Sequence, residues 1–278
     1  MKTILGPVEL HDQVAATLQA AALLGTAFGS YLEGFPLHPA LSPFLAADAM
    51  GATILYDAEF EEDEATLQKA RQAFENKMHA HGIAEGGGTA GQAAYNWRDE
   101  AQGDNFVGSH SRLFDITVVG RPGTKDGQPR GTTLEAALFE SGRPVLIAPP
   151  EELQKIGERI LIAWNGSTET ARTIGWAMPL LRRAQHVVVL TVKGSGVSGP
   201  SGKEVATYLD RHAIRAEVRS VEPGGRAAGK TTLDEVTNLG CDLLVRGAYT
   251  QSRLRQLIFG GTTRQIIAEA KVPVFMAH

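Results

Sequence analysis

The sequence has few of the residues that mark several classes of protein. It contains one cysteine in 278 residues, so an internal disulfide framework is excluded and a reducing compartment is favoured. Acidic and basic residues nearly balance, 31 against 27, for a net charge of −4. This balance gives no electrostatic basis for binding nucleic acid or an anionic membrane. No run of eighteen apolar residues occurs, so no membrane-spanning helix is expected.

The amino terminus, MKTILGPVELHDQ, lacks the long apolar region of a signal peptide, so we expect a cytoplasmic protein. An apolar fraction of 43% is typical of a globular chain with a sizeable core, and the length allows one large domain or two ordinary ones. Cys241 precedes an apolar strand, which favours a packed, inert thiol.

Familiar catalytic motifs are also missing. The sequence has no G-x4-G-K-(S/T), no G-x-S-x-G and no good dinucleotide-binding fingerprint, so a P-loop NTPase, a hydrolase and a dehydrogenase are disfavoured. The histidines lack the spacing of metal ligands and are expected at the surface; they include His79, His81, His110, His186 and His212. We therefore expect no enzyme, and at most a slow, incidental ATPase.

An internal repeat is the strongest feature that is present. DITVVG at 115–120 matches DLLVRG at 242–247, and GTT at 131–133 matches GTT at 261–263. In both places the GTT segment is followed by a predicted helix and a strand that begins Pro-Val. The two copies lie about 130 residues apart. The chain is therefore predicted to contain two divergent copies of one domain, at 1–150 and 151–278.

Predicted strands alternate with predicted helices through both copies, which indicates α/β domains with doubly wound parallel sheets. In the first copy we expect strands at 3–5, 26–34, 93–97, 116–119 and 144–148, and helices at 12–25, 59–81, 104–113 and 132–141. In the second we expect strands at 159–164, 187–192, 214–221, 243–245 and 273–277, with helices after residue 167 and at 201–212 and 228–239. A last helix is expected to open at 260–263, to have Lys271 in its last turn and to end at Pro273.

The last 37 residues, from Asp242 to His278, combine a buried strand, a glycine-containing loop and the start of a helix. The first turn of a helix has unpaired N–H groups and a positive macrodipole end, and glycine lets an anion approach the backbone. Phosphate binding and a purely structural turn are both open interpretations of this segment.

This segment resembles the carboxyl-terminal pattern of the universal stress protein family, G-x2-G-x9-G-(S/T) followed by a short helix and a Pro-Val strand. Gly247 and Gly260 occupy the first and third glycines, and Thr263 matches a common hydroxyl residue. Two positions depart from the pattern: Thr250 replaces the second glycine, and Gly261 replaces the Ser/Thr. The resemblance covers 159–278 well and 1–150 weakly. It implies two tandem Rossmann-like domains of the adenine nucleotide alpha hydrolase-like type.

Ligands of open parallel sheets bind at the carboxyl ends of strands, near the point where the strand order reverses. In the family an acidic residue after the first strand contacts the nucleotide; Asn165 stands there, and either ligand contact or helix capping would suit it. Flanking arginines can face phosphate or solvent. The candidate nucleotide-binding residues are Trp164, Asn165, Gly166, Val192, Gly247, Thr250, Arg253, Gly260, Gly261, Thr262 and Thr263.

The first copy departs further from the family pattern. Only seven residues separate Gly123 from Gly131, against nine in the family, and the first strand is followed by GPVEL in place of an Asp-Gly-Ser. We expect this copy to have lost nucleotide binding, with Lys125 and Arg130 simply solvated.

The leading hypothesis is a cytoplasmic, non-enzymatic module of the stress response that binds ATP or another adenine nucleotide, with Mg²⁺, in its second copy. The alternative is an interaction scaffold without nucleotide, in which the two Pro-Val strands pair the halves of one chain and the protein forms a homodimer. An adenylating or phosphoryl-transfer enzyme is a third, less favoured hypothesis, because no general base or metal carboxylates are evident. Neither nucleic acid nor membrane is an expected partner.

Overall fold

A computed structural model of the chain describes residues 1–38, 64–87, 91–125, 127–248 and 261–278. The elements of the first half are β1 (Thr3–Val8), α1 (Val14–Phe28), β2 (Tyr31–Pro36), α3 (Glu64–Ala80), β3 (Ala84–Glu85), β4 (Ala94–Trp97), α4 (Asp104–His110), a 3₁₀ turn (Ser111–Leu113), β5 (Ile116–Gly120), α5 (Gly131–Glu140) and β6 (Val145–Ala148). Those of the second half are β7 (Arg159–Ala163), α6 (Thr168–Leu181), β8 (His186–Val192), α7 (Gly202–Asp210), β9 (Ala216–Val221), α8 (Ala228–Asn238), β10 (Leu243–Gly247), α9 (Gly261–Glu269) and β11 (Val274–Ala277).

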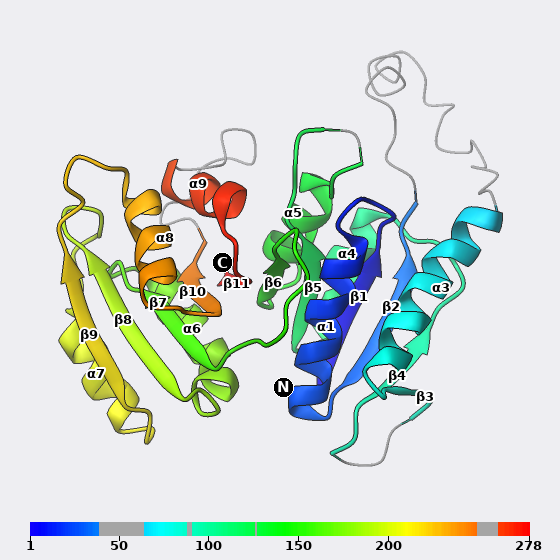
Figure 1. The fold of residues 1–278 in the computed structure, drawn as a ribbon, viewed down its shortest axis with the longest axis horizontal. Coiled ribbons are helices and arrows are strands. Elements are labelled where there is room, and N and C mark those ends of the chain that lie inside the picture. Colours follow the sequence, from blue (N-terminus) through cyan, green and yellow to red (C-terminus); the bar gives the residue numbers. More distant parts are fainter. Residues whose placement is uncertain (39–63, 88–90, 126, 249–260) are drawn as a thin grey trace.

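The described strands form one sheet in the order β3-β4-β2-β1-β5-β6-β11-β10-β7-β8-β9. Among the described strands, neighbours run parallel within each half, and only β6 and β11 are antiparallel. Each half reverses its strand order beside its first strand, between β1 and β5 and between β7 and β10. The predicted α/β class with doubly wound parallel sheets is confirmed (Figure 1).

Helices cover both faces of this sheet and create two core layers. One layer packs α1, α3, α6 and α7 against the sheet, with Phe74 and Ile174 among its buried residues. The other packs α4, α5, α8 and α9, with Leu134 and Ile266 among its buried residues. Strands with both faces covered in this way need nearly continuous apolar sequence, which β5, β6, β10 and β11 have.

The two halves meet where β6 pairs with β11. Phe275 is opposite Leu146, and both side chains are fully buried. The prediction that the two Pro-Val strands join the halves within one chain is therefore confirmed. A homodimer remains a prediction, and it needs a surface other than the edge of β11, because β11 already has a strand on each side.

Side chains add to this junction. The Arg121 guanidinium donates to the carbonyl oxygen of Ala270 at 3.0 Å, just beyond the end of α9. The guanidinium of Arg183, after α6, lies 5.1 Å from the ring centroid of Phe28, at the end of α1. A cation at the carboxyl end of a helix is favourable, and a guanidinium over an aromatic face is attracted to it. The halves are thus held by more than the strand pair.

The predicted boundaries shift most near the amino terminus. The helix expected at 12–25 continues to Phe28, and the strand expected at 26–34 begins only at Tyr31. Gly29 stops the helix, because its left-handed backbone (φ 56°) lets its N–H bond to the carbonyl oxygen of Gly25. The expected strand at 3–5 extends to Val8. No helix within the described ranges is both long and apolar enough to cross a membrane.

We expect Phe275→Ala to lower the free energy of unfolding by about 3–5 kcal/mol, because it leaves a cavity at the junction of the two halves. Urea unfolding would measure the change. Val218→Ala, on the outer strand β9 where the side chain is 38% exposed, is the control and should cost about 0.5 kcal/mol or less. A loss below about 1 kcal/mol for Phe275→Ala would contradict the role of this contact.

Candidate functional site

The carboxyl ends of β7, β8 and β10 form one edge of the second half. Asn165 follows β7, Val192 ends β8 and Gly247 ends β10. Since β8 and β10 are the two neighbours of β7, the sequence-predicted residues Trp164, Asn165, Val192 and Gly247 lie at the strand-order reversal, where open parallel sheets bind ligands.

Asn165 forms the turn that precedes α6. Its Oδ1 accepts hydrogen bonds from the Ser167 backbone N–H at 3.2 Å and from the Thr170 hydroxyl at 2.6 Å. Ser167 is the N-cap of α6, because its hydroxyl accepts from the Thr170 N–H. The predicted turn from Asn165 to Ser167 thus caps α6 through Ser167, and a ligand contact by Asn165 stays a prediction. The amide group Nδ2 is the part of the side chain that a ligand contact would use.

Gly247 allows α6 to approach the end of β10. A Cβ atom at this position would overlap the backbone nitrogen of Thr170 and lie 2.6 Å from the carbonyl carbon of Glu169. The Gly247 N–H also donates to the Thr170 hydroxyl at 3.3 Å. Thr170 thus ties the end of β10 to Asn165, and it holds two of the candidate positions together.

The glycine-containing loop after β8 lies on the segment Trp164 to Gly166. The Val197 N–H donates to the Asn165 carbonyl oxygen at 2.9 Å, and the Trp164 ring N–H donates to the Pro200 carbonyl oxygen at 2.7 Å. Gly166 has a φ of 81°, and a Cβ on it would meet the Val197 carbonyl oxygen at 2.6 Å. Any other residue at 166 would push this loop away from the candidate site.

Helix α9 begins at Gly261. Gly261 is exposed and Thr262 is half-buried. Thr263 is 4% exposed, so it faces the core more than a ligand. The predicted candidates Thr250, Arg253 and Gly260 lie outside the described residues.

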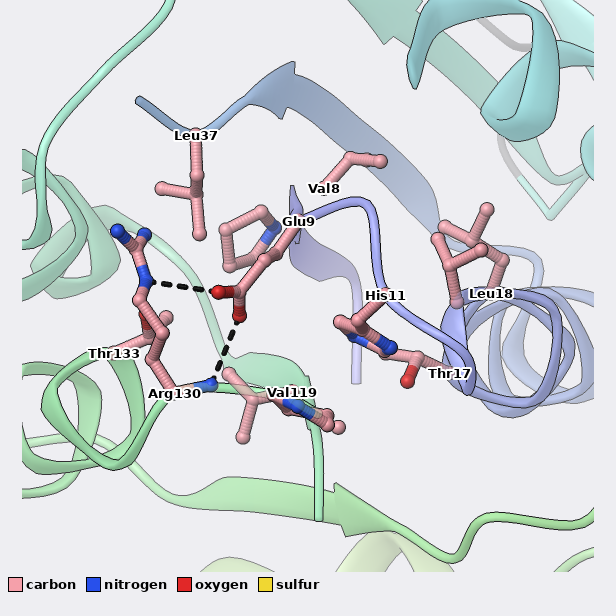
Figure 2. Close-up of a pocket in the computed structure, with 13 residues that line it drawn as sticks. Val8, Glu9, His11, Thr17, Leu18, Leu37, Val119, Arg130 and Thr133 are labelled. Carbon is pink, nitrogen blue, oxygen red and sulfur yellow. Dashed lines mark hydrogen bonds and ion pairs between the residues drawn. The ribbon is translucent and has the colours of Figure 1, made fainter. Parts of the chain in front are cut away.

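The corresponding edge of the first half contains a pocket that the sequence analysis did not anticipate (Figure 2). Its polar lining residues are Glu9, His11, Thr17, Arg130 and Thr133. Its empty volume of about 330 Å³ includes open solvent, and the space inside it has room for roughly one water. This pocket is too small for a nucleotide.

Arg130 is not solvated, contrary to expectation, whereas Lys125 is exposed as predicted. The Arg130 side chain is 16% exposed, and its Nε lies 2.9 Å from Glu9 Oε1. Figure 2 shows that the Arg130 backbone N–H donates to the other Glu9 oxygen, at 3.1 Å. Burial raises the pKa of Glu9, although Arg130 opposes the shift. Glu9 is not among the predicted site residues, because a first strand at 3–5 places it in a loop, whereas β1 continues to Val8.

His11 is the second titratable group of this pocket. Its Nδ1 accepts from the Gln13 backbone N–H at 3.0 Å, so the neutral ring carries its proton on Nε2. Burial lowers the pKa of His11 to about 4, although Asp12 opposes the shift. His11 is therefore a neutral cap of the turn before α1 at physiological pH.

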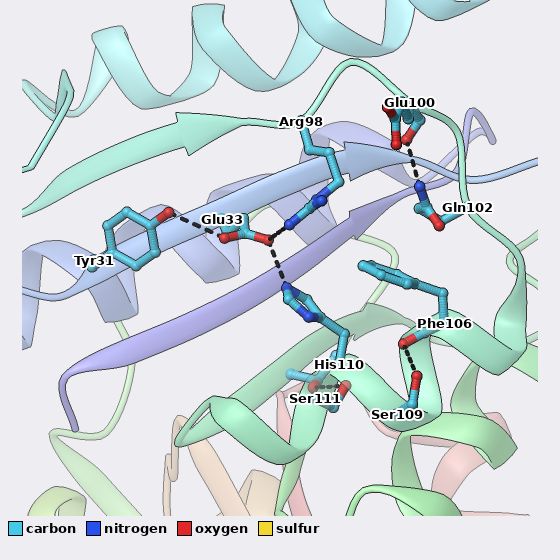
Figure 3. Close-up of polar contacts among 10 residues, drawn as sticks. Tyr31, Glu33, Arg98, Glu100, Gln102, Phe106, Ser109, His110 and Ser111 are labelled. Atoms are coloured by element: carbon cyan, nitrogen blue, oxygen red, sulfur yellow. Dashed lines mark hydrogen bonds and ion pairs between the residues drawn. The ribbon is translucent and has the colours of Figure 1, made fainter.

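A separate polar cluster lies on β2, β4 and α4 (Figure 3). The Glu33 carboxylate accepts from the Tyr31 hydroxyl at 3.1 Å, and its other oxygen lies 2.7 Å from His110 Nε2. Arg98 lies 3.4 Å from that second oxygen, and Phe106 stacks on the His110 ring. His110 is thus half-buried and fastens α4 to the sheet. Among the described residues, no group of three or more metal-ligating side chains occurs.

The geometry defines a doubly wound α/β protein with one strand-order reversal in each half. The model of the Universal stress protein family matches residues 157–278. A universal stress protein from Synechocystis sp. is 25% identical over 168 residues, which cover 58% of this chain and 57% of that relative. The chain thus matches less than two thirds of this curated relative's length.

The solved structures agree on the fold. The crystal structure of a universal stress protein from Archaeoglobus fulgidus matches with a TM-score of 0.70 at 13% identity, and the match covers 99% of this chain and 97% of that one. The family model thus matches residues 157–278, and the two halves together have the fold of that solved structure.

We expect Gly247→Ala to destabilise the protein by roughly 2 kcal/mol or more, because the added methyl group overlaps the backbone of α6. Gly261→Ala is the matched control. A Cβ on Gly261 meets nothing within 4 Å, so stability should stay equal or rise by up to about 1 kcal/mol. Chemical denaturation of the two variants would measure this, and equal stabilities would contradict the proposed close approach.

The pH dependence of stability tests the state of His11. The unfolded chain protonates His11 near its ordinary pKa of 6.5, whereas the folded protein protonates it only near about 4. The contribution of neutral His11 to the free energy of unfolding is therefore complete above pH 6.5 and is lost as the pH falls toward 4. His11→Asn keeps an acceptor for Gln13. We expect this variant to lose about 2 kcal/mol less than the parent between pH 7 and pH 4.5. An identical pH profile would contradict the assignment.

Proposed function

We propose that this protein is a non-enzymatic module of the cytoplasmic stress response whose second half binds an adenine nucleotide. The observation that carries the proposal is the coincidence of two independent features at one edge. The residues of the family's glycine pattern begin at Gly247, and Gly247 lies beside Asn165 at the strand-order reversal of the domain. Only the second half combines this edge with a glycine immediately before and at the start of its last helix.

The start of α9 supplies the chemistry for phosphate. Its first-turn N–H groups and its dipole favour an anion, and the exposed Gly261 leaves them accessible. Thr262 adds a hydroxyl donor. Asn165 would offer its Nδ2 donors to the base or ribose, because its oxygen is engaged by α6. The nucleotide would thus lie across the ends of β7, β8 and β10.

Mg²⁺ would enter with the nucleotide. Asn165, the second residue beyond β7, is an amide, which cannot replace a carboxylate as a strong ligand of a hard cation. The metal would therefore be held chiefly by the phosphate oxygens and water. ATP would act as an effector by binding one conformation of the protein better than another.

The alternative function is an interaction scaffold without nucleotide. The observation that favours it is the continuous sheet, in which β6 and β11 fuse the two halves and fix their orientation. In this account the edge near Gly247 is structural, and partner binding would depend on the outer surface of the joined halves.

ATP at about one hundred times its Kd should stabilise the protein by about 2.7 kcal/mol and raise the melting temperature by roughly 5 °C or more. Differential scanning fluorimetry with millimolar Mg²⁺-ATP measures this. Gly261→Asp should abolish the shift, because a carboxylate there repels phosphate, while the fold benefits from an acidic residue in the first turn.

Gly131→Asp, at the equivalent place in α5, is the matched control, because a Cβ there also meets nothing within 4 Å. It should keep the full ATP response. An unchanged melting temperature of the parent protein in ATP would support the scaffold in place of the nucleotide-binding module.

A further inference from the structure

The sheet register gives an alignment of the two halves. Ile4 pairs with Ile116 of β5, and Ile160 pairs with Leu243 of β10. Glu9 lies five residues after Ile4, and Asn165 lies five residues after Ile160. Glu9 and Asn165 therefore occupy the same place, directly beyond the first strand of their halves.

The last helices supply the second pair of equivalent positions. Helix α5 begins at Gly131 and α9 begins at Gly261. The residue before each helix is Arg130 in the first half and Gly260 in the second. Gly260 of the second half thus corresponds to Arg130 of the first half. This position precedes the helix, where an anion would approach its first turn.

Arg130 has several polar contacts inside the first half. Its Nε and backbone N–H both face the Glu9 carboxylate, at 2.9 and 3.1 Å. One terminal nitrogen donates to the His38 carbonyl oxygen at 3.0 Å, and the other lies 3.5 Å from Asp104. These contacts fix the guanidinium between the end of β1 and the start of α5.

We propose that Arg130 occupies the ligand position of the first half, so that this half is an adenine-nucleotide site closed by its own arginine. The guanidinium binds Glu9 in the region where, by the equivalence above, a nucleotide would lie between the first strand and the last helix. The ligand class rests on the proposed function of the second half.

The space left beside Arg130 agrees with closure. The remaining pocket, lined by apolar Val8, Leu37 and Val119 together with the polar pair, has room for roughly one water. Both partners are largely buried, and a buried ion pair that loses one member leaves an uncompensated charge. The closure is thus maintained by a strong penalty against moving either side chain alone.

The double variant Glu9→Asn/Arg130→Gly tests the proposal, because it gives the first half the residues that the second half has at the same places. It removes both charges together, and Asp104 keeps its hydrogen bond from the Thr133 hydroxyl at 2.7 Å. The variant is made in the Gly261→Asp background, in which the second half should not bind. Equilibrium dialysis with Mg²⁺-ATP would measure the bound nucleotide. We expect none per chain for Gly261→Asp alone and one per chain when the double variant is added.

No gain of binding by this folded variant would overturn the proposal. The same pair of substitutions in the parent background distinguishes closure of the first half from nucleotide binding by the second half. An increase from one nucleotide to two supports both proposals. An increase from none to one supports closure and contradicts binding in the second half. One bound nucleotide in both the parent and the double variant would contradict closure of the first half but would still support binding by the second half.

A measurement on the unmodified protein covers the case in which the double variant does not fold. Phenylglyoxal labels accessible guanidinium groups, and peptide mass spectrometry follows the rate at each arginine. Arg130 should react at least tenfold more slowly than the exposed Arg211. Equal rates would mean that Arg130 leaves the Glu9 carboxylate readily, and they would overturn the proposal.

Discussion

The structure depends on the antiparallel pairing of β6 with β11. Each half alone would present its last strand as an exposed edge of buried apolar residues, which is a hazard for aggregation. Pairing the two edges removes both at once and places Phe275 and Leu146 in a common core. The contacts of Arg121 with Ala270 and of Arg183 with Phe28 then hold the helices of the two halves in register.

The pairing brings together two halves whose residues at the strand-order reversal differ. In both halves a glycine ends the equivalent strand, Gly120 in β5 and Gly247 in β10. A Cβ at Gly120 would crowd Pro129 and Thr17 of α1, and a Cβ at Gly247 would crowd the backbone of α6. The backbone framework is therefore retained. What differs is the residue that follows the first strand and the residue that precedes the last helix. In our account one copy keeps glycine and an amide, and the other places an arginine and a glutamate in contact.

Much of this organisation is predictable from the sequence. Repeated strand patterns and the two Pro-Val segments were sufficient to anticipate the doubly wound halves and the pairing of β6 with β11. The environment of Arg130 was not predictable, because its partner Glu9 is 121 residues away and a charged residue in a Gly/Pro loop is ordinarily solvated. Pro7 also concealed the true end of β1, since proline is rare inside a strand. It is tolerated because the pairing with β5 includes only Ile4 and Leu5.

The most direct test of the account is the number of nucleotides that the unmodified protein binds. Native mass spectrometry of the full chain with Mg²⁺-ATP resolves each bound nucleotide as a separate mass. Our account predicts a single adduct per chain that saturates at one, since the second half binds and Arg130 closes the first. Saturation at two would show that the arginine does not close its site, and the absence of any adduct would contradict nucleotide binding by the second half.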